Sequence, residues 1–224
     1  MFAYKPDDPF SHTLLKEKQR ELRDTFPMPL TMRVHRGLSW LGRSERELAD
    51  SDVRFVLLWI GFNALYAGNI DQALSNERKV FREFFSTLVK LDNRHSIYDT
   101  VWERFPQEIR TLLANKYVFG PFWKFQNGEN EAEDWELHFK GGQRAVNKAL
   151  SRHDTPTILS IVFDRLYVLR NQLVHGGATW ESSVNRSQVN DGASILACLL
   201  PIFLDLMMDH PEQAWSMPHY PPVE

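Results

Sequence analysis

The amino-acid sequence predicts an all-α fold, built as one bundle of about eight helices. Apolar residues recur at steps of three and four along most of the chain, which is the period of an amphipathic helix. No stretch alternates apolar and polar residues over about six positions, as a half-buried strand would. With 224 residues, of which 43% are hydrophobic and 25% charged, the chain can bury a substantial core.

The first part of the chain is predicted to be peripheral. Ser11 can cap a helix that runs to about Asp24, and this helix is highly charged with few apolar residues. Pro27 and Pro29 end it, and a second helix is expected over 30–49. We therefore divide the chain into a peripheral N-terminal segment at 1–37, a helical bundle at 38–208 and a proline-rich tail at 209–224.

A central helix is expected next. Asp50 can cap it, acidic residues follow in its first turn, and it runs to about Tyr66. This helix is apolar nearly all round, which is typical of a helix in the centre of a bundle. Asn63 is its polar exception, and a buried amide needs a hydrogen-bond partner. Asn63 either bonds a neighbouring helix or lies near the polar motif described below.

The remaining helices follow from local signals. Gly68 should end the central helix, and Ser75 can cap the next one. The aromatic, turn-rich stretch at 120–134 is expected to be a loop whose rings pack on the bundle. The other helices are expected at 96–119, interrupted by Pro106, at 135–151, at 155–175, and at 192–208, where Pro201 should cause a kink.

The helix at 155–175 ends in a polar motif. Thr155 can cap it, with Pro156 at its first position, and Gly176-Gly177 can close it. Its apolar stripe consists of Ile158, Val162, Leu166, Leu169 and Leu173. The last turns hold Arg170, Asn171 and His175, so a fixed positive charge, an amide and an imidazole come together.

This set of side chains suits chemistry at a phosphate. Arginine donates hydrogen bonds in a fork that fits phosphate oxygens, and histidine can take or give a proton near neutral pH. An amide can orient a substrate oxygen or hold the imidazole tautomer. The structural alternative is that Arg170 and His175 only stabilise the C-terminal end of a helix through its dipole.

Two segments carry a resemblance to a known family. Arg170-Asn171-x-x-x-His175 at the end of a long helix resembles the signature of the HEPN superfamily. The apolar helix from Arg54 to Tyr66 resembles the early core helix of the larger, Apea-like HEPN proteins. The resemblance implies a helical bundle that forms a homodimer and acts as a metal-independent endoribonuclease, with both motifs in a groove at the dimer interface.

The resemblance also implies roles for residues. Arg170 would bind the scissile phosphate of an RNA substrate, His175 would act in proton transfer as the 2′-hydroxyl attacks, and Asn171 fills the polar position after the arginine. Some HEPN toxins carry a modified tyrosine two positions after the histidine, but this chain has Gly177 there. Further candidates for substrate binding are Asn63, Tyr167 and the basic face of the helix at 135–151, Lys140, Arg144 and Lys148.

Three functions stay open at this stage. The first is the endoribonuclease, which could serve as a toxin or defence effector held in check by an antitoxin or regulatory protein. The second is a non-catalytic HEPN-like module for dimerisation or protein interaction, which the net charge of −3 slightly favours. The third is a bundle that binds a nucleotide or another small ligand through Arg170.

The composition of the chain limits the disulfides, metal sites and cellular location that we expect. Cys198 is the single cysteine, so no internal disulfide forms, and no cluster of Cys and His has the spacing of a metal site. We expect no metal and no cofactor. The first ten residues lack the apolar run of a signal peptide, and the apolar run from Phe55 to Ala67 is too short to span a bilayer. A cytoplasmic protein without a membrane partner is expected.

Overall fold

The computed structural model describes residues 2–67, 70–129 and 132–220. Helix accounts for 73% of the chain, and the described residues contain no strand, so the all-α prediction is confirmed. The described helices are α1 (His12–Leu22), α2 (Met28–Ser44), α3 (Ser51–Tyr66), α4 (Ile70–Leu91), α5 (Ser96–Asp99), α6 (Pro106–Ala114), α7 (Gly120–Gln126), α8 (Trp135–Ser151), α9 (Thr155–Val174) and α10 (Arg186–Asp209).

The described residues form ten α-helices rather than eight, and the difference lies between residues 96 and 126. Here α5 leads through a π-helical turn at Thr100–Arg104 into α6, which starts at Pro106. The prediction of a loop at 120–134 was wrong for its first part, because Gly120–Gln126 forms α7 with Pro121 in its first turn. Buried Phe122 packs edge-on against Trp135 of α8, with 5.0 Å between the ring centroids, so tertiary packing supports this short helix.

Several helix boundaries differ from the expected ones. The cap of α9 is Asp154, whose carboxylate accepts from the Thr157 amide at 3.1 Å, so Thr155 is the first helical residue and not the cap. Helix α4 begins at Ile70 instead of being capped at Ser75. The cap at Asp50 and the end at Tyr66 agree with the sequence. The predicted stop at Gly68 lies outside the described residues.

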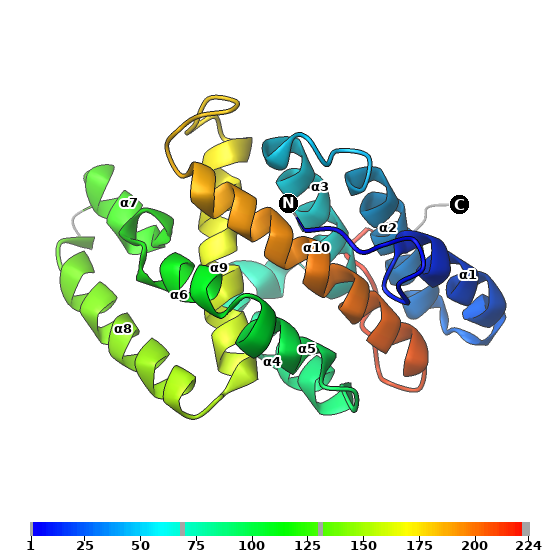
Figure 1. Cartoon of the computed structure of the whole chain (residues 1–224). Helices are drawn as coiled ribbons and strands as arrows, with labels where there is room; N and C mark the ends of the chain where they lie inside the picture. Colours follow the sequence, from blue (N-terminus) through cyan, green and yellow to red (C-terminus); the bar gives the residue numbers. More distant parts are fainter. Residues whose placement is uncertain (1, 68–69, 130–131, 221–224) are drawn as a thin grey trace.

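The centre of the bundle is a cluster of phenylalanines from four helices. Helix α3 packs against both α2 and α10, and α9 packs against α4 (Figure 1). Phe62 of α3 and Phe163 of α9 meet with 4.3 Å between ring centroids, and Phe85 of α4 lies 4.7 Å from Phe163. Phe203 of α10 completes the cluster at 5.8 Å from Phe85. These rings hold α3 and α9 side by side, which fixes the setting of the polar motif on α9.

Glycines let the central helices approach closely. A Cβ atom on Gly37 of α2 would lie 2.8 Å from Leu65 of α3 and 2.9 Å from Leu204 of α10. A Cβ atom on Gly61 of α3 would lie 2.8 Å from Leu200 of α10. Real Cβ atoms do not come this near other atoms, so a larger residue at either position would require these buried leucine side chains to shift. Leu15 and Leu30, from the N-terminal segment, are also fully buried in the same core.

Helices α8 and α10 differ in how much of each is buried. Helix α8 lies at the outer edge of the molecule beside α7 (Figure 1) and buries only Val146 and Ala149. Helix α10 crosses the bundle and is buried along most of its length. Its length and apolar composition would allow a membrane span, yet 89% of the relevant window is buried inside the bundle, as in the core helix of a globular protein.

Candidate functional site

The polar motif sits at a sharply defined helix end. The Gly177 amide donates to the Gln172 carbonyl at 2.7 Å, and the Gly176 amide donates to the Leu173 carbonyl at 3.3 Å. Gly176 has a φ of 70°, the left-handed conformation that glycine adopts without strain. This pair of bonds is the Schellman ending of a helix. The double glycine therefore stops α9 at Val174 and leaves His175 at its C-cap position.

Arg170 and His175 point to different sides of α9. Five residues along a regular helix correspond to a rotation of about 140°, whereas the four from Asn171 to His175 correspond to about 40°. Arg170 and Asn171 are half-buried, and His175 is exposed. The motif therefore divides within one chain into an inward-facing arginine and an outward-facing histidine.

Two aromatic rings hold the Arg170 side chain. Its guanidinium carbon lies 4.9 Å from the ring centroid of Tyr167, one turn earlier on α9, and 5.7 Å from that of Trp59 on α3. Cations over aromatic faces are attracted by the ring quadrupole, and more strongly where water is excluded. Tyr167 thus contacts the motif arginine directly, and Trp59 joins it from the neighbouring helix.

Arg170 lines a pocket of about 560 Å³. The pocket lies among α2, α3, the end of α9 and the C-terminal tail, and Asn63 faces it from α3. The structure therefore brings Asn63 and Arg170 to one cavity. Helix α2 contributes a second cation, Arg36, and a large ring, Trp40. Cavities of this size with a few polar groups are typical of ligand sites.

Buried polar atoms without hydrogen bonds gather around Arg170. Two are donors, Nε of Arg170 and Nε1 of Trp59, and two are acceptors, Oδ1 of Asn63 and Oδ1 of Asn171. None of the four bonds to another atom among the residues that the structure describes. Buried polar groups in folded proteins are nearly always paired with protein or ordered water, so such a concentration marks a place for water, a ligand or another chain.

The C-terminal tail forms one wall of this pocket. Arg33 is 1% exposed and donates to the carbonyls of Ser216 at 2.8 Å and Met217 at 3.2 Å, and also to the Ser216 hydroxyl at 2.9 Å. The same guanidinium donates to the carbonyls at the end of α3, including that of Leu65 at 2.7 Å. Arg36 donates to the Tyr220 carbonyl at 2.7 Å. The two arginines hold Pro218, His219 and Tyr220 against the pocket.

The basic face of α8 lies elsewhere. Lys140, Arg144 and Lys148 are exposed, and none of them lines the Arg170 pocket, whose walls come from α2, α3, α9 and the tail. His175 does not line it either. A single chain therefore brings together Arg170, Tyr167 and Asn63, and leaves His175 and the basic face outside this cavity.

Exposed apolar side chains occur at the start of α3, at the end of α9 and in the segment between α9 and α10. Trp180 is 68% exposed, and its indole donates to the Asp50 carboxylate at the start of α3, at 2.9 Å. Val174, next to His175, is 53% exposed. We call Val53, Val174, Trp180 and Val184 the Trp180 surface. Exposed large apolar side chains are candidates for contact with a partner.

Sequence reasoning missed part of this pocket. Trp59, the second ring against Arg170, was missed although it lies four residues before the predicted Asn63 in α3 and so shares a face with it, which was a usable signal. Arg36 and Trp40 share a face of α2 in the same way, but nothing local tells that this face meets the end of α9. The tail residues carry no signal at all, because only the hydrogen bonds of Arg33 and Arg36 bring them to the pocket.

No family model, curated protein or solved structure matches this chain. Among the described residues, no three His, Cys, Asp or Glu side chains gather as they would around a metal ion.

Proposed function

We propose that this protein is a metal-independent endoribonuclease of the HEPN type. The observation that carries the proposal is Arg170, which is held by two rings and borders a cavity with Asn63. Two pocket-lining residues, Arg170 and Asn63, hold a donor and an acceptor without hydrogen bonds, which suits a ligand that both accepts and donates. A ribose-phosphate unit has this character, because its hydroxyl groups donate and its phosphate oxygens accept.

The proposed reaction is attack of an RNA 2′-hydroxyl on the adjacent phosphorus. A bond forms between the 2′-oxygen and phosphorus, the bond from phosphorus to the 5′-oxygen of the next nucleotide breaks, and the products are a 2′,3′-cyclic phosphate and a 5′-hydroxyl. A base takes the 2′-hydroxyl proton, and the leaving 5′-oxygen receives a proton. Arg170 would neutralise charge on the phosphate oxygens, and His175 would carry one of the two proton transfers.

A homodimer is part of this proposal. Arg170 faces a pocket that His175 of the same chain does not line, so one chain alone does not present both groups to one phosphate. A second copy that docks on the Trp180 surface would bring its own motif next to the first. This surface has apolar area to bury, because the indole of Trp180 is exposed and so is the side chain of Val174, which is next to His175.

The RNA contacts follow from the pocket. Arg36 would hold a second phosphate, and Trp40 offers a ring on which a base of single-stranded RNA can stack. Asn63 would accept from a base or ribose hydroxyl. The basic face of α8, which stands away from the pocket, would guide a longer RNA by its charge.

One observation favours a second candidate, the non-catalytic interaction module. The Trp180 surface would serve a protein partner equally well without any chemistry, since Trp is prominent among interface residues that dominate binding energy. In that case Arg170 would serve only the packing of α9 against α3, and His175 would have no reaction to assist.

The experiment that separates the two is RNA cleavage in EDTA by the wild type and by His175→Ala, with mass spectrometry of the product ends. His35→Ala is the matched control, because His35 is an exposed histidine on α2. The nuclease predicts cyclic-phosphate ends with wild type and His35→Ala and none with His175→Ala, while sedimentation shows the same dimer for all three. Wild type that leaves both structured and single-stranded RNA intact would reject the nuclease in favour of the module.

A further inference from the structure

Five aromatic side chains form one connected group where α7 and the turn before it meet the start of α8. We call this group the α7 aromatic surface: Tyr117, Phe122, Trp123, Phe125 and Trp135. The ring centroid of Phe122 lies 5.4 Å from that of Tyr117, 5.2 Å from that of Trp123 and 5.0 Å from that of Trp135. Phe125 joins the group through Trp135, with 6.4 Å between the ring centroids. These contacts place all five rings at one corner of the molecule.

The centre of this group is buried, and three of its rings are exposed. Phe122 is 7% exposed, whereas Tyr117, Trp123 and Phe125 are 46%, 36% and 41% exposed. Protein interfaces are enriched in Tyr, Trp and Phe, so exposed rings in contact with one another are candidates for contact with a partner.

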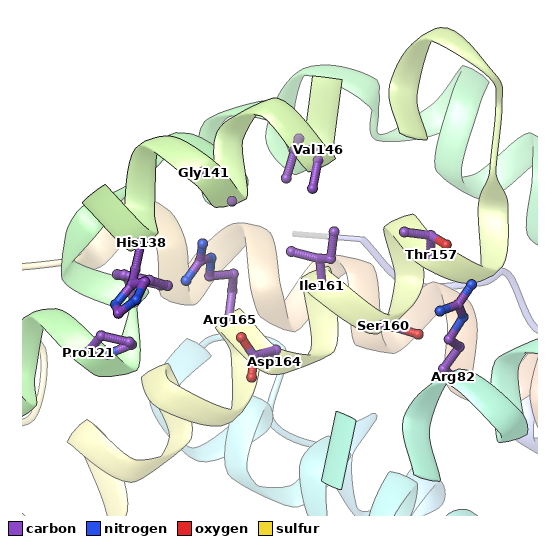
Figure 2. Close-up of a pocket in the computed structure, with 13 residues that line it drawn as sticks. Arg82, Pro121, His138, Gly141, Val146, Thr157, Ser160, Ile161, Asp164 and Arg165 are labelled. Atoms are coloured by element: carbon purple, nitrogen blue, oxygen red, sulfur yellow. The ribbon is translucent and has the colours of Figure 1, made fainter. Parts of the chain in front are cut away.

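The α7 aromatic surface is held in position by contacts with the bundle. The Trp123 indole donates to the Tyr117 carbonyl at 2.7 Å, and the side-chain amide of Gln172 on α9 donates to the same carbonyl at 2.6 Å. Behind the surface, Pro121 of α7 lies beside His138 of α8 at one end of the cavity between α8 and α9 (Figure 2). A surface that is ordered before binding loses less conformational entropy when a partner docks.

The charge around these rings is negative. From residue 116 to residue 137 the sequence holds five acidic residues and two lysines. The described acidic residues of this stretch are all exposed: Glu129, Glu133, Asp134 and Glu136. Glu129 pairs with Lys124, with 3.6 Å between Oε2 and Nζ, and the other three make no salt bridge within the described residues. Because RNA phosphates would meet like charge here, this corner favours a positively charged partner.

The rings of this surface accept a cation from the chain itself. Nζ of Lys116 lies 5.3 Å from the ring centroid of Tyr117 and 5.5 Å from that of Phe122. A cation over an aromatic face is attracted by the ring quadrupole. Arginine has in addition a planar guanidinium, which stacks on rings and pairs with a carboxylate through two parallel hydrogen bonds. Exposed rings with carboxylates beside them therefore suit arginine better than lysine.

We propose that the α7 aromatic surface binds an arginine-rich segment of another protein. Some guanidinium groups of this segment would stack on the exposed rings of Trp123 and Phe125, and others would pair with the carboxylates on either side of Trp135. Charge complementarity selects this occupant, because an acidic segment would be repelled. None of these residues lines the Arg170 pocket, so the proposal does not depend on the nuclease.

The test is fluorescence anisotropy of labelled probes with the whole chain. The probes are a peptide of Arg-Ser repeats, the same peptide with lysine in place of arginine, and an oligouridine. The arginine peptide should bind saturably, roughly fivefold more tightly than the lysine peptide, and more weakly as the salt concentration rises. Equal binding of the two peptides, tighter binding of oligouridine, or no saturable binding of the arginine peptide would each overturn the proposal.

The contribution of the rings is tested with Phe125→Ala, which should weaken binding of the arginine peptide roughly fivefold. Tyr98→Ala is the matched control, because Tyr98 is a ring on α5, 37% exposed, outside this group. Circular dichroism establishes that both variants are folded. Sedimentation of wild type and Phe125→Ala without peptide gives a further outcome. Self-association that is lost in Phe125→Ala would assign the surface to a second copy of this chain and overturn the proposal.

The contribution of charge is tested with the double variant Glu133→Gln, Glu136→Gln. Both side chains are exposed, so this variant gives a result even if Phe125→Ala fails to fold. Binding of the arginine peptide should again weaken roughly fivefold. The control is Glu17→Gln, Glu21→Gln, which removes the same charge from exposed positions on α1, on the side of the molecule away from α7 and α8 (Figure 1). Equal weakening by the two double variants would show a dependence on net charge alone and would reject this surface as the binding site.

Discussion

The guanidinium of Arg170 lies over the ring of Tyr167, with 4.9 Å between the guanidinium carbon and the ring centroid. The two residues are three apart on α9 and therefore occupy neighbouring positions on one face. Trp59 approaches the same guanidinium from α3 at 5.7 Å. Because planar guanidinium stacks on rings and an ammonium does not stack in this way, the site depends on arginine and not only on positive charge.

The first prediction concerns this stacking. Arg170→Lys keeps the charge but loses the planar fork, so we expect RNA cleavage to fall about 100-fold, close to the effect of removing one donor to a developing charge. Thermal unfolding should change little, because Arg170 is half-buried and lies at the end of α9. Initial cleavage rates measure the first effect, with Lys90→Arg at an exposed position in the last turn of α4 as a control. A lysine variant as fast as wild type would contradict the role of the fork.

The second prediction contrasts two buried arginines, Arg33 and Arg54, each 1% exposed. Arg33 bonds the tail and the end of α3, and burial lowers the pKa of Arg33 to about 10, so it is still charged at neutral pH. Nε and Nη1 of Arg54 make no hydrogen bond within the described residues. Arg33→Met should lower the free energy of unfolding by about 3 kcal/mol, since the carbonyls at the end of α3, including the buried one of Leu65, and those of the tail lose a charged donor.

Arg54→Met should instead leave the free energy of unfolding unchanged or raise it by about 1 kcal/mol, because a buried charge is replaced by an apolar side chain of similar length. Urea denaturation measures both variants. Limited proteolysis should also cut the Arg33 variant near Ser216 sooner than wild type, because the tail has lost its anchor. Equal destabilisation by both substitutions would show that hydrogen bonding does not separate these arginines.

The third prediction is a pH dependence at Asp50. Burial tends to raise the pKa of this carboxyl, but hydrogen bonds from the Val53 amide and the Trp180 indole outweigh it and lower the pKa below its ordinary 3.8. A carboxyl with a lowered folded pKa stabilises the fold above its unfolded pKa, and this contribution is lost as the pH falls through the folded pKa. Asp50→Asn keeps a capping acceptor but cannot titrate.

The stability advantage of wild type over Asp50→Asn should therefore be constant from pH 7 to about pH 5 and shrink below about pH 4. Urea denaturation at a series of pH values measures it. Asp50→Ala, which removes the cap itself, should cost about 1 kcal/mol at neutral pH. If the stability advantage of wild type over Asp50→Asn grew on acidification, folding would raise the pKa of Asp50, which contradicts the prediction.

The fourth prediction compares glycines. Gly37→Ala should lower the free energy of unfolding by about 1–3 kcal/mol, because the new methyl group would meet Leu65 at 2.8 Å in a close-packed core. Gly142→Ala should raise it by about 0.5–1 kcal/mol, because its methyl group meets nothing and alanine is the better helix former. Thermal unfolding of the two variants measures whether each substitution raises or lowers the stability. A stabilised Gly37 variant would show that α2 and α3 are free to move apart.

Helix ends were predictable where a local chemical reason exists. Asp50 and Gly176 were identified because a carboxylate cap and a left-handed glycine act within a few residues of themselves. Helix α7 was missed because glycine and proline at its start usually indicate a turn, and only the packing of Phe122 on α8 shows otherwise. The contact of Phe122 with α8 therefore decided the local structure at 120–126, against the turn that Gly120 and Pro121 favour.

The candidate site was predictable to the same extent. The sequence predicted Arg170, Asn171 and His175 as one motif because they lie within the last turns of one helix. The pairing of Arg170 with Asn63 was one of two alternatives, since the sequence does not tell which face of α3 meets α9. Arg36 and Tyr220 could not be found, because their meeting depends on the Arg33 bonds to the tail. Residues joined only by tertiary hydrogen bonds leave no period or spacing in a sequence.

The wall made by Pro218, His219 and Tyr220 gives the Arg170 pocket an order of assembly during protein synthesis. Translation proceeds from the N-terminus, so α2, α3 and α9 leave the ribosome before these three residues do. The helices that carry Arg36, Asn63 and Arg170 can therefore pack while the pocket still lacks one side. The cavity reaches its final shape only when the latest-made of its residues arrives and Arg33 and Arg36 capture it.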